Sequence, residues 1–169
     1  MKLEEMRAFS SEESLSEHRE YLEKLRLKYS VLTKSDSRLS GLSLFELLRK
    51  FPKSDIKNEA VSLMSRIFAH ELFFDSFSSH RVLRERIGRF SVGSYLFSLY
   101  RKASAADCGI LYIYPDLGFE LLPECEPPRA LPVLCIDLYE HAYFQDYRFD
   151  RQRYIEAALS HLNLDRFEK

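Results

Sequence analysis

The chain has 169 residues, 46% of them hydrophobic and 30% charged, as expected for one compact domain or two small lobes that share a core. Its net charge of −1 excludes the strongly basic surface that binds nucleic acid or an anionic membrane. No segment is apolar for long enough to predict a membrane span, and the N-terminal residues lack the apolar run of a secretory signal. We therefore expect neither nucleic acid nor membrane as a partner.

Three cysteines, Cys108, Cys125 and Cys135, are an odd number and lack the paired spacing of a structural metal site. They are typical of reduced thiols, which predicts a cytoplasmic protein.

The first half of the chain predicts helices. Ser10 or Ser11 can cap a helix over about residues 12–32, in which apolar residues recur at helical spacing. A short helix is expected over residues 43–50 and a second long one over about residues 54–77. Two long amphipathic helices in this order predict a helical hairpin.

The second half mixes helices and strands. Residues 81–104 are expected to be helical with a break near 88–93, and the chain is expected to end in helices over residues 140–162. Between them lie segments rich in β-forming residues and separated by turn residues, which predict an antiparallel meander: 109–114, 119–122 and 131–138.

The expected fold class is therefore α+β. An N-terminal α-helical hairpin domain over residues 1–78 precedes a C-terminal α/β domain over residues 79–169, which contains a three-stranded antiparallel sheet.

The segment DLYEHAY at residues 137–143 is the most informative one for function. Asp137 stands where a strand is expected to end, and His141 follows four residues later, where a helix begins. Their carboxylate and imidazole can therefore converge on one metal ion. His70, on the second long helix, can complete a site of two histidines and one carboxylate. This donor set suits iron or manganese redox chemistry better than structural zinc.

This segment resembles the Asp-x-Trp-Glu-His-Ala-Tyr motif of the iron/manganese superoxide dismutases. Downstream, Tyr147, Arg151 and Tyr154 keep the family's Tyr, Arg and Tyr spacing. Upstream, AHELFF at residues 69–74 is similar to the family's Asn-His-x-x-Phe-Trp, which carries the second metal ligand. Two shorter matches follow in the family's order, YLEKL at residues 21–25 and SLFEL at residues 43–47.

The resemblance implies one iron or manganese ion per chain, with His70, Asp137 and His141 as ligands. It also implies an antioxidant activity that converts superoxide to O₂ and H₂O₂ by redox cycling of the metal. Two residues are expected to support catalysis in a homodimer. Tyr21 would be the substrate-gate tyrosine, unless it is simply a packed core aromatic, and Glu140 would pair with the partner subunit's ligand histidine.

The chain departs from the family at the first ligand. Family histidines stand eight and four residues before the helix-one tyrosine, and here Glu13 and Glu17 occupy those places before Tyr21. We expect Glu13 as the first ligand, with His18 as its substitute. An acidic first turn, favoured by the helix dipole, explains both glutamates equally well. A glutamate ligand would lower the metal's reduction potential and impair turnover.

A glutamine that hydrogen-bonds the metal-bound solvent in the family is also missing. In iron types this glutamine lies four residues before the second ligand, and this chain has Arg66 there. In manganese types it precedes a segment that corresponds here to residues 105–108, and this chain has no glutamine there either. Phe144 stands where the family has a tyrosine that reaches the neighbouring subunit's site, which argues against a dimer of the family's kind.

The leading function is superoxide dismutation with impaired turnover, by a chain whose residues 79–169 form a C-terminal domain of the superoxide dismutase type. Two alternatives remain open. A mononuclear iron oxidase or oxygenase can use the same donors, and a non-catalytic paralogue can retain the fold for dimerisation or scaffolding around a weak or empty site. Stoichiometric metal that stabilises the protein would exclude the paralogue.

Overall fold

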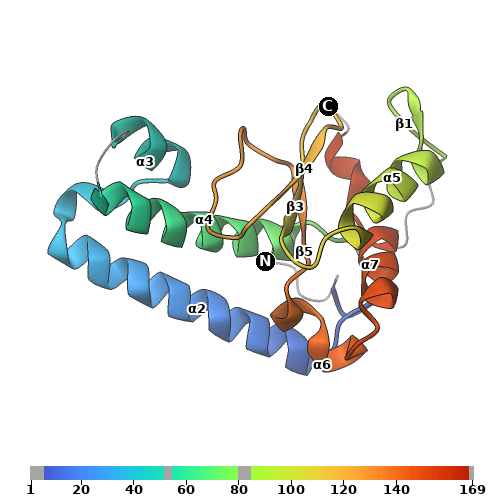
Figure 1. Cartoon of the computed structure of the whole chain (residues 1–169), viewed down its shortest axis with the longest axis horizontal. Coiled ribbons are helices and arrows are strands. Elements are labelled where there is room, and N and C mark those ends of the chain that lie inside the picture. The colour runs from blue at the N-terminus through green and yellow to red at the C-terminus, as the bar shows by residue number, and fades with distance from the viewer. Residues whose placement is uncertain (1–5, 52–54, 80–84, 168–169) are drawn as a thin grey trace.

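Two long helices, α2 (Glu12–Ser35) and α4 (Asp55–Asp75), lie side by side along one edge of the molecule (Figure 1). The computed structural model describes residues 6–51, 55–79 and 85–167. The short helices η1 (Ser37–Leu39) and α3 (Leu44–Lys50) lie at the end where the chain turns from α2 to α4. These elements form the predicted helical hairpin.

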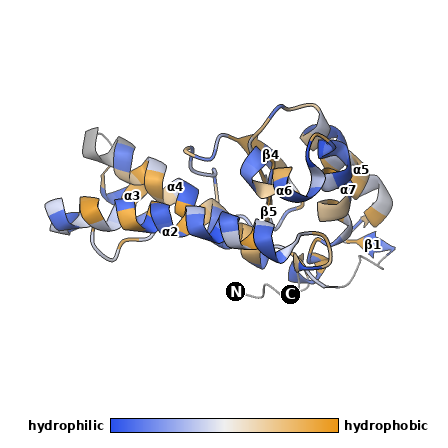
Figure 2. Ribbon diagram, turned by 90° about the horizontal axis from the view of Figure 1, so that it is seen from below, coloured by the Kyte–Doolittle hydropathy of each residue, from blue (hydrophilic) through white to orange (hydrophobic). Residues whose placement is uncertain are grey.

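Local capping explains where these helices begin. The Ser11 hydroxyl accepts a hydrogen bond from the backbone N–H of Ser14 and so caps α2. Ser43 and Glu46 form a reciprocal capping box at the start of α3. Along α2, hydrophilic and hydrophobic residues alternate (Figure 2), which leaves one face to bury against the rest of the molecule. The fully buried leucines of that face are Leu15, Leu22 and Leu25.

A three-stranded antiparallel sheet packs against α4. Its strands are β3 (Ile110–Ile113), β4 (Phe119–Leu122) and β5 (Leu134–Asp137), in the order β4-β3-β5. Every residue of β3 and β5 is buried, as expected for strands that are covered on both faces. The register pairs Ile110 with Asp137, so the last residue of β5 lies beside the first residue of β3.

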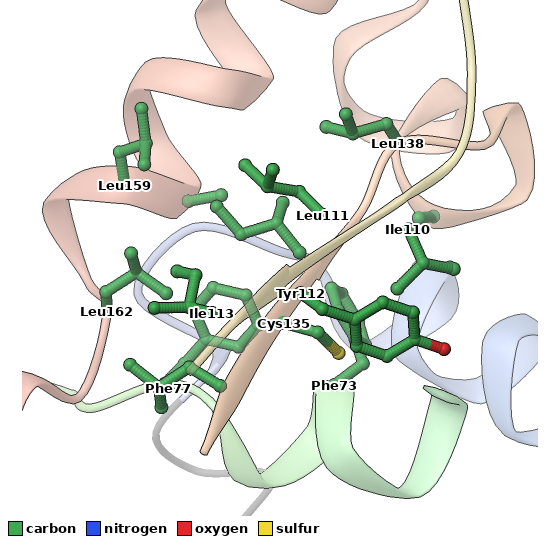
Figure 3. Close-up of a cluster of buried hydrophobic side chains, with 14 of the residues drawn as sticks. Phe73, Phe77, Ile110, Leu111, Tyr112, Ile113, Cys135, Leu138, Leu159 and Leu162 are labelled. Atoms are coloured by element: carbon green, nitrogen blue, oxygen red, sulfur yellow. The ribbon is translucent and has the colours of Figure 1, made fainter. Parts of the chain in front are cut away.

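Two buried contacts fix β5 against α4. The backbone N–H of Cys135 donates to the Ser76 hydroxyl over 2.8 Å, and that hydroxyl donates to the Leu72 carbonyl over 2.7 Å. Figure 3 shows Phe73 from α4, and Phe77 from the segment just after it, beside Tyr112, Ile113 and Cys135 of the sheet. Because the helix and the strand are joined within one core, His70 on α4 and Asp137 on β5 have fixed relative positions.

One segment differs from the sequence prediction. Within residues 81–104, the described part begins with a hairpin of β1 (Arg86–Ile87) and β2 (Phe90–Ser91), and only α5 (Val92–Ser104) is helical. Gly88 lies in the turn with a φ of +53°, a conformation that glycine adopts at little cost. The predicted break near 88–93 thus begins with the turn that joins β1 to β2, and the helix predicted on its N-terminal side is absent over the described residues 85–87.

The chain closes with short helices around the end of β5. They are η2 (Glu140–Ala142), α6 (Phe144–Tyr147), α7 (Arg151–Ser160) and η3 (Leu164–Phe167). Packing of η2 and α6 against α2 brings the C-terminal helices next to the N-terminal hairpin (Figure 1).

The predicted α+β fold class, with an N-terminal helical hairpin and a C-terminal three-stranded antiparallel sheet, is confirmed. One hydrophobic core contains residues from both halves of the chain, and the division into domains at residues 78 and 79 stays a prediction. Within the described parts of the chain, no helix has both the length and the apolar character needed to cross a membrane.

Candidate metal centre

Four side chains from both halves of the chain meet beside the end of β5. They are His18 from α2, His70 from α4, Asp137 from β5 and His141 from η2, and one ligand atom of each lies within 4.8 Å of all the others. The first three are buried, and the His141 side chain is 31% exposed. Three imidazoles and one carboxylate thus share a small and largely solvent-excluded volume.

The Asp137 carboxylate lies at the middle of this group. Its Oδ2 atom is 3.0 Å from His141 Nε2, and the Nε2 atoms of His18 and His70 lie 3.3 Å and 3.5 Å from the same oxygen. The other oxygen, Oδ1, accepts a 2.9 Å hydrogen bond from the backbone N–H of Tyr139. That bond fixes the carboxylate at the point where β5 turns into η2.

A backbone contact orients His70. Its Nδ1 atom lies 2.6 Å from the Arg66 carbonyl oxygen, one helical turn earlier in α4. A carbonyl oxygen can only accept a hydrogen bond, so Nδ1 carries the proton. The lone pair of Nε2 is therefore free to bind a metal ion and faces the other three potential metal ligands. His70 Nε2 lies 3.2 Å from His141 Nε2. This is the arrangement that a metal-binding imidazole needs: the ring nitrogen on the far side is held by a hydrogen bond.

Aromatic rings enclose His18. Its ring centroid lies 4.7 Å from that of Phe73 and 5.2 Å from that of Phe74. Its Nε2 atom is buried and makes no well-aligned hydrogen bond to any residue in the described part of the chain. A buried nitrogen without such a partner is costly, and a metal ion bound beside Asp137 would satisfy it. The donor group therefore fits a metal ion.

Two tyrosine rings flank His141. Tyr139 stacks on it with ring centroids 5.8 Å apart and planes 7° from parallel, and Tyr21 lies 4.8 Å away. Tyr21 also lies 5.0 Å from His70. Tyr21 is thus beside the donor group, at its more exposed side.

The three downstream residues Tyr147, Arg151 and Tyr154 each donate a hydrogen bond to a backbone carbonyl oxygen. The buried Tyr154 hydroxyl donates a 2.6 Å hydrogen bond to the Asp137 carbonyl oxygen. Arg151 donates to the Ala103 carbonyl oxygen at the end of α5, and the Tyr147 hydroxyl donates to the Phe9 carbonyl oxygen. Tyr154 thus holds the backbone of Asp137, whereas Arg151 and Tyr147 bind backbone carbonyls of other segments.

The charges of the group are set by burial and by the Asp137–His141 pair. Burial alone would raise the pKa of Asp137, but His141 and His18 outweigh it, and the pKa lies well below its usual range. Burial alone would lower the pKa of His141, but the charge and hydrogen bond of Asp137 raise it above its usual value. Asp137 is therefore an anion at neutral pH.

The other two imidazoles are neutral. Burial lowers the pKa of His70 to about 4 and also lowers the pKa of His18. A metal can bind only to an unprotonated imidazole nitrogen, so these two rings are ready to bind it at neutral pH.

The pKa values of His70 and His18 are lowered and that of His141 is raised, which predicts that the metal-free protein is most stable near pH 6.5. His70 and His18 are buried in their neutral form, with pKa values below the usual histidine value of 6.5. Between pH 6.5 and about 4 the unfolded chain therefore binds more protons than the folded one, and the free energy of unfolding falls as the pH falls through that range. The contribution of His141 is complete below pH 6.5 and is lost as the pH rises through its raised pKa. Asp137 contributes above its usual pKa of 3.8, outside this window.

Thermal unfolding of chelator-treated protein tests this expectation. His70 alone should account for about 3 kcal/mol of stability lost between pH 6.5 and about pH 4. The His70→Gln variant, which keeps a side chain of similar size without a titrating ring, should show a shallower loss on the acid side. Equal acid slopes in parent and variant would contradict the assignment of His70 as a buried neutral ring.

Some of the predicted site residues lie in the group of four and others lie outside it. His70, Asp137 and His141 come together as expected. For the fourth position, His18 lies in the group, whereas Glu13 and Glu17 are exposed and lie outside it. In the family, the first ligand lies eight residues before the tyrosine of this helix. Here His18 lies only three residues before Tyr21, and a separation of three residues also places both side chains on one helix face.

Glu140 is exposed at the first position of η2 and lies outside the group of four. Sequence reasoning missed one neighbour of the group entirely. The Tyr21 hydroxyl donates to Glu124, in the loop after β4, over 3.0 Å to Oε1 and 3.3 Å to Oε2. A lone glutamate in a proline-rich loop has no sequence signal that would reveal this contact.

Comparisons with known proteins agree with the geometry. Residues 121–169 match the model of the iron/manganese superoxide dismutase C-terminal domain. A chloroplastic iron superoxide dismutase 3 from Arabidopsis thaliana is 23% identical over 163 residues, an alignment that covers 86% of this chain and 60% of the relative. Iron superoxide dismutases from Aquifex aeolicus and Aquifex pyrophilus are each 46% identical over 43 residues, which cover 23% of this chain and 20% of those proteins.

The chain thus spans about 60% of the length of the plant relative and a smaller part of the two bacterial ones. The domain match contains Asp137 and His141, and the plant alignment extends over most of the rest of the chain. Together with the ordered motifs, these matches confirm that the chain resembles the iron/manganese superoxide dismutase family, most clearly over the residues of the C-terminal domain match.

Proposed function

We propose that the chain binds one iron or manganese ion through His18, His70, Asp137 and His141 and converts superoxide to O₂ and H₂O₂. The observation that carries the proposal is the convergence of three imidazole nitrogens and one carboxylate oxygen within 4.8 Å, in a largely buried position and with a single carboxylate among the four. A neutral nitrogen set with one anion suits a metal that cycles between +2 and +3.

A metal ion held by these four residues would supply the one-electron redox chemistry that dismutation of superoxide requires. The protein residues hold and shield the site. Asp137 supplies the balancing negative charge, and the Arg66 carbonyl fixes the His70 ring. Phe73 and Phe74 exclude water on the His18 side. This leaves the side of Tyr21 and His141 as the more accessible one.

Tyr21 holds a proton at this side. Burial, and then the negative charge of Glu124, raise the pKa of Tyr21 to about 12, so its hydroxyl stays protonated and donates to Glu124. Forming H₂O₂ from superoxide consumes protons, and the Tyr21 ring, whose centroid lies 4.8 Å from that of His141 and 5.0 Å from that of His70, brings a protonated side chain next to the donor group.

The donor set also bears on turnover. With Glu13 as a ligand the site would contain two carboxylates, which would stabilise the oxidised metal and lower the reduction potential. With His18 in that place the set contains one carboxylate. The proposed activity is therefore limited by the missing glutamine rather than by a second anionic ligand.

A superoxide assay on iron-loaded and manganese-loaded protein tests the proposal, with two variants that distinguish the alternative first ligands. His18→Gln is expected to lose metal and activity. Glu13→Gln, an exposed substitution five residues earlier, is expected to keep both. Loaded protein that leaves superoxide untouched would contradict dismutation, and oxygen uptake without superoxide would favour the oxidase or oxygenase alternative instead.

A homodimer in the cytoplasm completes the proposal. Glu140 is exposed, as a residue that pairs across an interface would be in a single chain. Four and nine residues later in the chain are two exposed apolar rings, Phe144 and Phe149, with centroids 5.6 Å apart. Exposed apolar side chains that follow an exposed charged residue in the chain support a contact with a second copy.

A further inference from the structure

Three polar side chains from separate elements meet beside the proposed metal centre: Tyr21 from α2, Arg66 from α4 and Glu124 from the loop after β4. Glu124 Oε1 accepts from the Tyr21 hydroxyl over 3.0 Å and lies 3.4 Å from Arg66 Nε. The Glu124 side chain is 13% exposed and the Arg66 side chain 33%. Opposite charges so largely withdrawn from water interact more strongly than a surface pair.

Glu124 is held in place through its backbone. Its N–H donates to the Tyr139 hydroxyl over 3.2 Å, and the Tyr139 ring is the one that stacks on His141. The loop, the stacked ring and the imidazole therefore form one connected unit. Arg66 is tied to the centre in a second way, because its carbonyl oxygen accepts from His70 Nδ1.

The positive charge of Arg66 is compensated by the Glu124 carboxylate. Its Nε atom is buried and makes no well-aligned hydrogen bond within the described residues, and the Glu124 carboxylate provides its compensating charge. Without that carboxylate, the positive charge of Arg66 would be uncompensated next to the accessible side of the centre. An anion entering from that side would then be attracted more strongly.

We propose that Glu124 is a positioning residue of the metal centre, which holds the Tyr21 hydroxyl and the Arg66 guanidinium in place and weakens the affinity of the bound metal for small anions. This inference rests on the proposed metal site. The carboxylate lies outside the donor group, so its removal leaves the four ligands intact and changes only the charge and hydrogen bonding around them.

Azide titration of the iron(III)-loaded protein, followed by visible absorption, tests the proposal independently of turnover. Glu124→Gln keeps the size of the side chain and removes its charge, and is expected to raise azide affinity on the order of tenfold. Arg66→Ala is expected to lower it. Glu126→Gln, the same charge change on an exposed residue of the same loop, is expected to leave it unchanged.

The reduction potential provides a second readout, and Glu124→Gln is expected to raise it because a nearby negative charge favours the oxidised metal. Glu124→Gln that takes up iron but matches Glu126→Gln in azide affinity and potential would overturn the inference and leave the metal site standing. Loss of iron from Glu124→Gln alone would also overturn it, because a ligand role would then replace the positioning role. A parent protein that takes up no iron would overturn the proposed function together with the inference.

Discussion

Asp137→Asn is expected to weaken metal binding by at least about 100-fold, the largest effect of any single conservative change at the site. Asparagine keeps the shape of the side chain and can still accept the hydrogen bond from the Tyr139 N–H. It removes the only anion among the four donors, whose Oδ2 lies within 3.5 Å of all three imidazoles. A neutral amide neither balances the metal's charge nor raises the pKa of His141.

The measurement is thermal unfolding of metal-free protein with increasing iron(II) or manganese(II). A ligand present at 100 times its dissociation constant stabilises the native state by about 2.7 kcal/mol, so the parent's midpoint should rise and that of Asp137→Asn should not. Asp107→Asn, the same substitution at an exposed aspartate, should behave as the parent. A metal-induced rise of equal size in Asp137→Asn would show that the ion binds elsewhere.

Phe73→Ala is expected to cost about 3–5 kcal/mol of folding stability and, in addition, to weaken metal binding. Phe73 is 1% exposed, packs against Phe74 and Phe77, and forms a wall of the His18 ring, 4.7 Å away. Truncation leaves a cavity in the core and removes a contact that holds the His18 imidazole beside Asp137.

Phe77→Ala separates the two effects. Phe77 is equally buried, lies two residues after the end of α4, and packs against Phe73 and Phe9 rather than against a histidine of the group. Both variants should lose similar stability in urea unfolding of the metal-free protein, whereas metal affinity should fall by about tenfold or more only in Phe73→Ala. Equal loss of affinity in both would mean that core stability, not the position of His18, controls binding.

Much of the fold and part of the site could be predicted from the sequence because local signals and long-range structure agree there. A serine cap predicts the start of α2 and helical spacing predicts both long helices, and the seven-residue segment predicts Asp137 at a strand end and His141 in the turn that follows. Where signals were weak, prediction failed. For the hairpin around Gly88 the sequence predicts a broken helix instead, because strands of two residues are too short to show alternation.

The fourth donor could not be settled by counting along the chain. Family spacing from Tyr21 leads to Glu13, but both Tyr21 and His18 lie on the face of α2 that meets the centre, since a separation of three residues returns to the same face. The contact of Glu124 with Tyr21 and Arg66 depends on how a loop folds back over two helices, which no local pattern encodes.

Metal content per chain tests the central claim most directly. Elemental mass spectrometry of purified protein loaded with iron or manganese is expected to give about one ion per chain in the parent and almost none in His141→Ala, which removes the donor 3.0 Å from Asp137 Oδ2. Parent protein without bound metal, even after refolding with either ion, would contradict the proposed centre and leave the α+β fold as described.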